Sequence, residues 1–224
     1  MSERGSMQMA IDRLTVPLER AGLDGYLALR EAAPGLVIVA NGVGDSGNGT
    51  RNHRLLAGLH AIGFSALLIE LLTERERRDR RRRSDVALLS RRLAATQHWT
   101  QTRVAAARHH VALLGIGPGA AAALVTAAAF PTDVAAVISL SGRPDLAGGS
   151  LRAVTAPTLL IVGGLDHALV SRNFDARQHL ECPSRLLVIS AATHHFDEPG
   201  CLEGALSATG SWLDNYVRPP QRAS

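Results

Sequence analysis

Short apolar runs alternate with amphipathic segments along most of the 224-residue chain. Uninterrupted apolar runs of this length are typical of strands buried on both faces, and segments with apolar residues every three or four positions are typical of helices. The pattern predicts strands at 35–41, 65–72, from about 109 into the glycine turn at 115, 134–140, 157–164 and 184–190. It predicts helices at 50–63, 84–103, 119–129, 168–181 and around 202–213.

Local signals mark the ends of several of these elements. Thr50 is expected to cap the first helix and Gly63 to end it, and Ser84 with Asp85 is expected to open the long helix that follows. Two shorter runs, 14–19 and 23–29, predict an antiparallel start to the sheet. The alternation of strands and helices indicates an α/β fold, in which a mainly parallel sheet carries helices on both faces.

No linker divides the chain, so we expect one domain over 14–217, between a disordered segment at 1–13 and a C-terminal tail at 218–224. Apolar residues make up 46% of the chain, enough for a full core. The chain has no uncharged apolar run of about eighteen residues, and its first residues carry charges where a signal peptide needs an apolar centre. We therefore expect a soluble cytoplasmic protein, with Cys182 and Cys201 as free thiols.

The positive charge of the chain is concentrated in one segment. All 24 basic residues are arginine, and seven of them lie within Arg75–Arg83, interleaved with Glu76 and Asp79. The segment has no aromatic residue on which a base could stack, which argues against nucleic acid as a partner. We expect a solvated, mobile loop, with a patch that binds an anion or a protein partner as the alternative.

Three glycines at alternate positions end the apolar run "VALLGIGPGAAAAL" at 111–124. Gly115, Gly117 and Ala120 satisfy the Gly-x-Gly-x-x-Gly/Ala fingerprint of a dinucleotide site between a strand and a helix. That fingerprint normally opens the first strand–helix unit, whereas about four strands precede it here. The acidic residue expected about 20 positions later is also missing from "VISLSGR", although its serines and Arg143 would suit the 2′-phosphate of NADP.

The same turn is also the Gly-x-Ser-x-Gly nucleophile elbow of a hydrolase, with Gly117 in the place of the serine. Downstream, Asp166 follows one predicted strand and His194 follows the last one. The chain order of elbow, acid and histidine is that of α/β-hydrolases, and both partners lie where the strands of such sheets end.

Several motifs give the chain a resemblance to the dienelactone-hydrolase-like branch of the bacterial α/β-hydrolases. The motifs are "VIVANGVGDSGNGTRNHRLLAGLHAIGFSALLIELLTERE", "LGIGPGAAAALVTAAA", "ISLSGRPDLAGG", "APTLLIVGGLDHAL" and "ISAATHHFDEPG", and the resemblance runs over about 14–214. It implies an α/β-hydrolase fold with about eight strands and an ester, lactone or carboxylate ligand. It also implies Asp166 as the orienting acid, and His194 rather than His195 as the base.

The resemblance further places oxyanion donors just after Asn41, at about Gly42 and Val43. At the elbow the chain departs from the family in two adjacent positions. Gly117 has no side chain that could attack a carbonyl, and Pro118 has no backbone N–H to serve as the second oxyanion donor. Loss of one such donor costs about 3 to 4 kcal/mol of transition-state stabilisation.

Two routes to activity remain without a nucleophile at residue 117. Ser141 is a candidate substitute, since it ends the strand after the elbow and is expected near His194. Alternatively, His194 and Asp166 activate water or remove a substrate proton. The pair also has a purely structural interpretation, in which it fixes two loops.

Together these features predict a member of this group that is impaired or inactive as an esterase and binds a small ligand. The alternatives are an enzyme that uses the His194–Asp166 pair, and an interaction protein that acts through the Arg75–Arg83 segment. No metal or other cofactor is expected, since the adjacent His194 and His195 lack the helical spacing of zinc ligands. A homo-oligomer is possible, and no membrane partner is expected.

Overall fold

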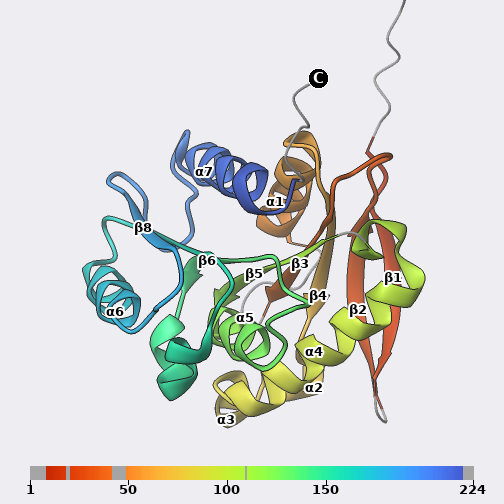
Figure 1. Cartoon of the computed structure of the whole chain (residues 1–224), viewed down its shortest axis with the longest axis horizontal. Helices are drawn as coiled ribbons and strands as arrows, with labels where there is room; N and C mark the ends of the chain where they lie inside the picture. The colour runs from red at the N-terminus through yellow and green to blue at the C-terminus, as the bar shows by residue number, and fades with distance from the viewer. Residues whose placement is uncertain (1–8, 19–20, 42–48, 109, 219–224) are drawn as a thin grey trace, which may run out of the picture.

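The computed structural model describes residues 9–18, 21–41, 49–108 and 110–218, and its centre is one eight-stranded sheet (Figure 1). The strand order is β1-β2-β4-β3-β5-β6-β7-β8, in which β3 to β8 are parallel and β1 and β2 are antiparallel. The strands are β1 Asp12–Leu18, β2 Ala21–Ala28, β3 Leu36–Asn41, β4 Ser65–Glu70, β5 Val111–Gly117, β6 Ala136–Gly142, β7 Thr158–Gly163 and β8 Ser184–Ile189. This architecture confirms the predicted α/β-hydrolase fold.

Helices cover both faces of the sheet (Figure 1). They are α1 Thr50–Ala61, α2 Glu74–Arg77, α3 Arg80–Arg83, α4 Val86–Arg103, α5 Pro118–Ala129, α6 His167–Arg177 and α7 Cys201–Tyr216, with 3₁₀ segments η1 Ala105–Arg108 and η2 Pro144–Ala153. Helices α1 and α7 lie on one side, and α4, α5 and α6 lie on the other (Figure 1). Within the described ranges, none of these helices has the length and apolarity needed to cross a membrane.

Alternate side chains of each central strand enter different cores. On β3, Leu36 and Ile38 pack with residues of α4 and α5, whereas Val37 and Val39 pack with residues of α1 and α7. All four are fully buried. Because both faces of the strand are covered, its sequence is continuously apolar rather than alternating, which is the signal that predicted a central parallel strand.

The antiparallel start is confirmed, but it begins earlier than expected. Strand β1 opens at Asp12, so Asp12 and Arg13 belong to the sheet and not to the expected disordered segment. Arg13 pairs with Asp24 of β2 at 3.1 Å. Residues 1–8 and 219–224 of the expected terminal segments lie outside the described residues.

Of the predicted helix caps, the one at the start of α4 is confirmed and the one at the start of α1 is wrong. Thr50 is the first residue of α1 and not its cap, because Gly49 takes the N-cap position and no side chain caps the helix. Asp85 does cap α4, and its carboxylate accepts a hydrogen bond from the backbone N–H of Leu88 at 3.0 Å. Gly63 follows α1 with a φ of 105°, a left-handed conformation that suits glycine after a helix end.

The arginine-rich segment forms two short helices, so the expectation of a loop is wrong. Thr73 and Glu76 form a reciprocal capping box at the start of α2, and Asp79 caps α3. Glu76 also receives two hydrogen bonds from the guanidinium of Arg92 on α4, at 2.7 and 2.9 Å. This pairing lowers the pKa of the Glu76 carboxyl to about 2.

Candidate active site

The turn between β5 and α5 has the shape of a nucleophile elbow. Gly117, the last residue of β5, has φ 54° and ψ −130°, a conformation that is strained for any residue with a side chain. Pro118 occupies the first position of α5, where its fixed φ is favourable and its missing N–H breaks no helical hydrogen bond. The proline that removes the oxyanion donor is therefore a good residue for starting the helix.

Small residues allow this tight turn. A Cβ atom at Gly115 would overlap the backbone of Ala120, and one at Gly142 would overlap Ala120 and the hydroxyl of Ser139. At Gly117, by contrast, a Cβ atom would meet no atom of the described residues within 4 Å. Gly115 and Gly142 are thus tightly packed, whereas the described residues leave space for a side chain at position 117.

Asp166 serves two partners with its two carboxylate oxygens. It is the N-cap of α6, where Oδ1 accepts a hydrogen bond from the backbone N–H of Leu169 at 3.1 Å. Oδ2 lies 3.3 Å from Nδ1 of His194. The structure therefore brings together the two residues predicted as acid and base, 28 positions apart in the chain.

The loops that carry these two residues are joined along their backbones. Gly164 donates a hydrogen bond to the carbonyl of Ile189 at 2.8 Å, and Leu165 donates one to the carbonyl of Ala192 at 3.0 Å. Gly163 leaves room for the second loop, since a Cβ atom there would overlap the backbone at Ala192. The two glycines of "VGGLDHA" thus let the acid loop lie directly against the histidine loop.

The imidazole of His194 is partly exposed, and its surroundings favour the neutral form. Burial lowers its pKa below the usual 6.5, and the hydrogen bond with Asp166 acts in the opposite direction. The ring of His195, edge-on at 5.2 Å between centroids, and the guanidinium of Arg51 also lower it. A neutral ring that donates Nδ1–H to Asp166 keeps a lone pair on Nε2, which is the state of a general base.

Ser141 contacts the histidine loop through the backbone of His194. It is the extra residue of a bulge between β5 and β6, with φ 47°, and it is fully buried. Its hydroxyl donates a 2.7 Å hydrogen bond to the carbonyl oxygen of His194. The expected approach to His194 is real, but this contact makes Ser141 a brace for the loop, and we do not carry it forward as a nucleophile.

The buried carboxyl of Glu70, which the sequence does not single out, holds the side chain of the predicted site residue Asn41. The amide of Asn41, at the end of β3, donates to Glu70 on β4 at 3.1 Å, and Arg77 donates to the other oxygen of Glu70 at 3.1 Å. Burial raises the pKa of Glu70, and both partners oppose the rise. Gly42 and Val43, the expected oxyanion donors, lie outside the described residues.

The residues predicted as base and orienting acid thus form a pair, and the position predicted for the nucleophile is a glycine. Such a pair can accept a proton from water or from a bound ligand, but Gly117 gives it no hydroxyl or thiol to activate. Within the described part of the chain, no group of three or more histidine, cysteine and acidic residues is arranged to hold a metal ion.

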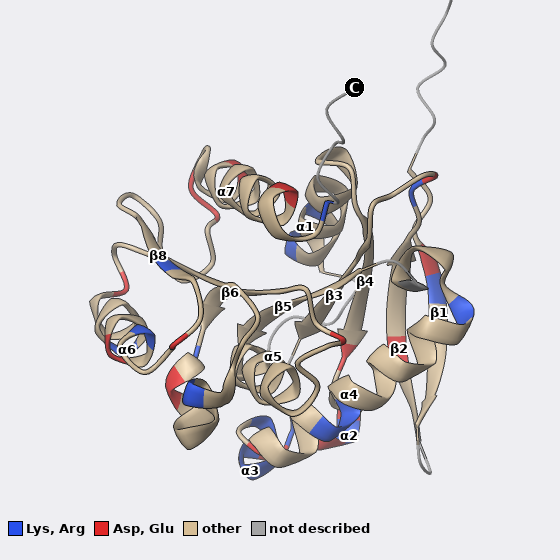
Figure 2. Ribbon diagram, viewed as in Figure 1, with Lys and Arg blue, Asp and Glu red and all other residues tan. Residues whose placement is uncertain are grey.

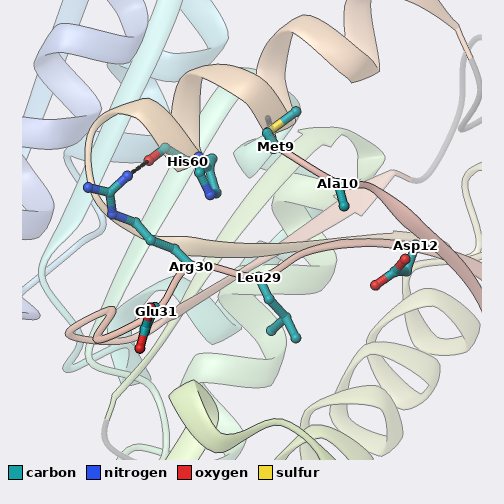
Figure 3. A pocket seen from close by; sticks show the side chains of 7 residues that line it. All are labelled: Met9, Ala10, Asp12, Leu29, Arg30, Glu31 and His60. Carbon is teal, nitrogen blue, oxygen red and sulfur yellow. Dashed lines mark hydrogen bonds between the residues drawn. The ribbon is translucent and has the colours of Figure 1, made fainter. Parts of the chain in front are cut away.

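A separate hollow of about 470 Å³ lies between the start of β1, the end of β2 and the end of α1 (Figure 3). Arg30 reaches across it and donates to the carbonyl of His60 at 3.0 Å (Figure 3). Ala28 of β2 pairs with Ala66 at the start of β4, so this hollow lies at the amino-terminal edge of the parallel strands. His194 and Asp166 lie at the opposite edge, and the hollow is not part of their site.

Known proteins resemble this chain in fold or in sequence. Est1E from Butyrivibrio proteoclasticus is 14% identical, with a TM-score of 0.76 over 91% of this chain and 98% of that one, which shows a shared fold. A Mycobacterium tuberculosis protein named "Putative phosphoribosyl transferase Rv0571c" is 40% identical over 196 residues, or 88% of this chain. The match covers 44% of that relative, so this chain spans less than half of its length.

A dienelactone hydrolase from Anabaena variabilis is similar over almost the whole chain. Its crystal structure is 38% identical, with a TM-score of 0.87, and the match covers 94% of this chain and all of that one. The model of the dienelactone hydrolase family matches residues 23–200. That match contains the glycine turn at 115–119 and the two residues predicted as acid and base, Asp166 and His194. The chain belongs to the dienelactone hydrolase family.

Proposed function

We propose that this protein binds a small ester, lactone or carboxylate at the carboxyl edge of the sheet and is impaired or inactive as a serine or cysteine esterase. The observation that carries the proposal is the open space at Gly117 beside an intact pair of Asp166 and His194, 3.3 Å apart. The space that a nucleophile would take is available to an atom of the ligand.

The chemistry of the surrounding groups supports this class of ligand. A neutral His194 offers Nε2 as an acceptor to a hydroxyl or carboxylic acid, or as a donor after protonation. Arg51 lies close enough to donate to the carbonyl of His194 at 3.5 Å, and its charge favours an anionic or polar ligand nearby. No bound metal or organic cofactor is part of the proposal.

A second candidate is an enzyme in which the pair acts without a covalent intermediate. It is favoured by the contact of His194 with Asp166 and by the lowered pKa of the imidazole, because a neutral imidazole oriented by a carboxylate can remove a proton from water or from a carbon acid. In that case His194→Ala abolishes a measurable turnover. Pro118 still leaves the developing oxyanion without one donor, so we expect slow reactions of activated lactones.

Activity assays and ligand-binding assays distinguish the two candidate functions. Short-chain p-nitrophenyl esters should show no turnover above that of His194→Ala, and a fluorophosphonate probe should label no residue. Small carboxylates, lactones and esters should raise the melting temperature of the parent protein and do so less in His194→Ala. Covalent labelling of Ser141, or rapid ester hydrolysis, would contradict the binding proposal. Lactone turnover that is lost in His194→Ala, without covalent labelling of any residue, would favour the second candidate.

We also propose that the protein acts in the cytoplasm. Cys182 is partly buried and Cys201 is buried, and both are free thiols, as suits a reducing compartment. The proposal includes no phosphoribosyl transferase activity, because this chain spans only 44% of the length of the relatives that carry that name.

A further inference from the structure

Arginine residues are concentrated on the two short helices α2 and α3 (Figure 2). Arg75 lies on α2 and is exposed, and α3 consists of Arg80–Arg83, of which only Arg83 is partly buried. In the part of the chain that the structure describes, no carboxylate pairs with the side chains of these five residues. They form a compact cationic surface, here called the arginine knob.

The acidic residues of the segment do not neutralise the knob. Glu76 turns inward and is held by Arg92, and Glu74 forms an exposed pair with Arg78 at 2.9 Å. One carboxylate oxygen of Asp79 accepts the backbone N–H of Arg81 at 2.9 Å as a helix cap. None of these three carboxylates forms an ion pair with a side chain of the knob.

The knob is anchored to the body of the protein. Arg92 is 8% exposed and binds both Glu76 and the carbonyl of Leu71, the latter at 2.8 Å. Arg77, between Arg75 and the knob's second helix, reaches back to Glu70 at 3.1 Å. The backbone that carries the five free arginines is thus already ordered, so a partner need not order a loop when it binds.

We propose that the arginine knob binds the phosphate backbone of double-stranded nucleic acid without sequence preference. Guanidinium groups form charge-assisted, bidentate hydrogen bonds with phosphates, and a row of closely spaced phosphates can engage several of them at once. Arg80, Arg81 and Arg82 are all exposed, so several guanidinium groups of α3 are accessible to phosphates at once. The knob shares no residue with the candidate active site, so this role is independent of the proposed function.

The surface composition favours a duplex over the other polyanions. The segment from Glu74 to Ser84 contains no aromatic side chain on which unpaired bases could stack, which disfavours single strands. The expectation against nucleic acid rested on this stacking, which binding to the phosphates of a duplex does not need. Among the described residues, every exposed large apolar side chain lies elsewhere in the chain, so nothing on the knob would enter a bilayer. These are Leu29, Phe130, Leu165, Phe174, Val188 and Tyr216.

The test measures binding of the full chain to a labelled DNA duplex of roughly 20 base pairs by fluorescence anisotropy, at salt concentrations from about 50 to 200 mM. We expect a dissociation constant near the micromolar range that weakens steeply with salt, as for other charge-driven binding. The variant R80Q/R81Q/R82Q/R83Q should bind at least about tenfold more weakly at low salt and lower the salt slope by about 3.

A matched control removes the same charge from scattered exposed positions, in R103Q/R152Q/R172Q/R185Q. It should keep most of the affinity, and circular dichroism and melting should show that both variants remain folded. The double variant R80Q/R82Q, with an intermediate loss of affinity, tests the same surface if the fourfold variant is unstable. Absence of duplex binding at low salt, an equal loss in the control, or displacement by poly-glutamate as effective as by unlabelled duplex would each overturn the proposal, the last in favour of an acidic protein partner.

Discussion

The hydroxyl of Ser141 donates a 2.7 Å hydrogen bond to the carbonyl oxygen of His194, 53 positions further along the chain. The contact links the end of β6, beside the elbow, to the loop that carries the base. It fixes the backbone of His194 while Asp166 fixes the ring. His194 is therefore held from two sides, through its backbone by β6 and through its ring by the N-cap of α6.

Replacement of Ser141 by alanine should loosen the histidine loop. We expect a loss of about 1 to 2 kcal/mol in the free energy of unfolding, because the His194 carbonyl loses a buried donor. Ser141→Gly loses the same bond but relieves the strain of φ 47°, so it should be the more stable of the two variants. Urea denaturation measures both. If the alanine variant equals the parent in stability, the bond contributes nothing and the bracing role is wrong.

Restoring a hydroxyl at the elbow should not by itself restore an esterase. Gly117→Ser has space for its side chain, but Pro118 still withholds the backbone donor. The double variant G117S/P118A should exceed G117S in kcat for p-nitrophenyl acetate by about 10²- to 10³-fold, the effect of one oxyanion donor.

The control for this experiment is G117S/P118A/H194A, which should return to background. The φ of 54° at residue 117 should also destabilise both serine variants by about 1 to 3 kcal/mol, so activities are compared at a temperature where both are folded. A single variant as active as the double one would show that Pro118 does not impair the oxyanion site.

The lowered pKa of His194 makes a prediction about pH. As the pH falls from neutral, the unfolded chain takes up a proton on this residue near pH 6.5, and the folded protein does so only at lower pH. The contribution of His194 to stability is therefore complete above about pH 6.5 and is lost as the pH falls through the folded-state pKa.

The measurement is the free energy of unfolding of the parent protein and of His194→Gln between about pH 7.5 and 5. The parent should lose more stability than the variant over this range. Any turnover that depends on the pair should persist to below pH 6.5 before it falls. If this turnover already falls as the pH drops toward 6.5, His194 is protonated more easily than its surroundings imply.

The link between α2 and α4 should be important for stability. Arg92→Met leaves Glu76 without its main partner, and we expect a loss of about 2 to 3 kcal/mol, below the range for fully buried pairs because Glu76 retains some contact with water. Arg78→Met, which removes a fully exposed pair with Glu74, should change stability by less than about 0.5 kcal/mol. Thermal unfolding compares the two, and equal effects would contradict the anchoring role of Arg92.

The sequence predicts most of the fold because the central strands are buried on both faces. Strands such as β3 and β5 then read as unbroken apolar runs, and the helices between them have clear apolar faces. The errors fall where tertiary contacts decide the outcome. Nothing local indicates that Glu76 faces Arg92, sixteen positions away, and without that pair the arginine-rich segment looks like a mobile loop.

The candidate site was predicted in part from chain order and position. Asp166 and His194 follow strands whose carboxyl ends meet, so their proximity could be expected. Glu70 could not be singled out, because its burial depends on the register that places it opposite Asn41. The role of Ser141 was also hidden, since a bulge between β5 and β6 turns its hydroxyl toward the backbone of the histidine loop.

The double duty of Asp166 bears on how this site changes over evolution. Because one oxygen caps α6, selection for folding alone is enough to retain the aspartate in a lineage that no longer uses the imidazole. His194 has no such second task among the contacts of its ring in the described residues, so drift would remove it first. Retention of His194, rather than of Asp166, in proteins descended from this chain would therefore indicate that the pocket is still used.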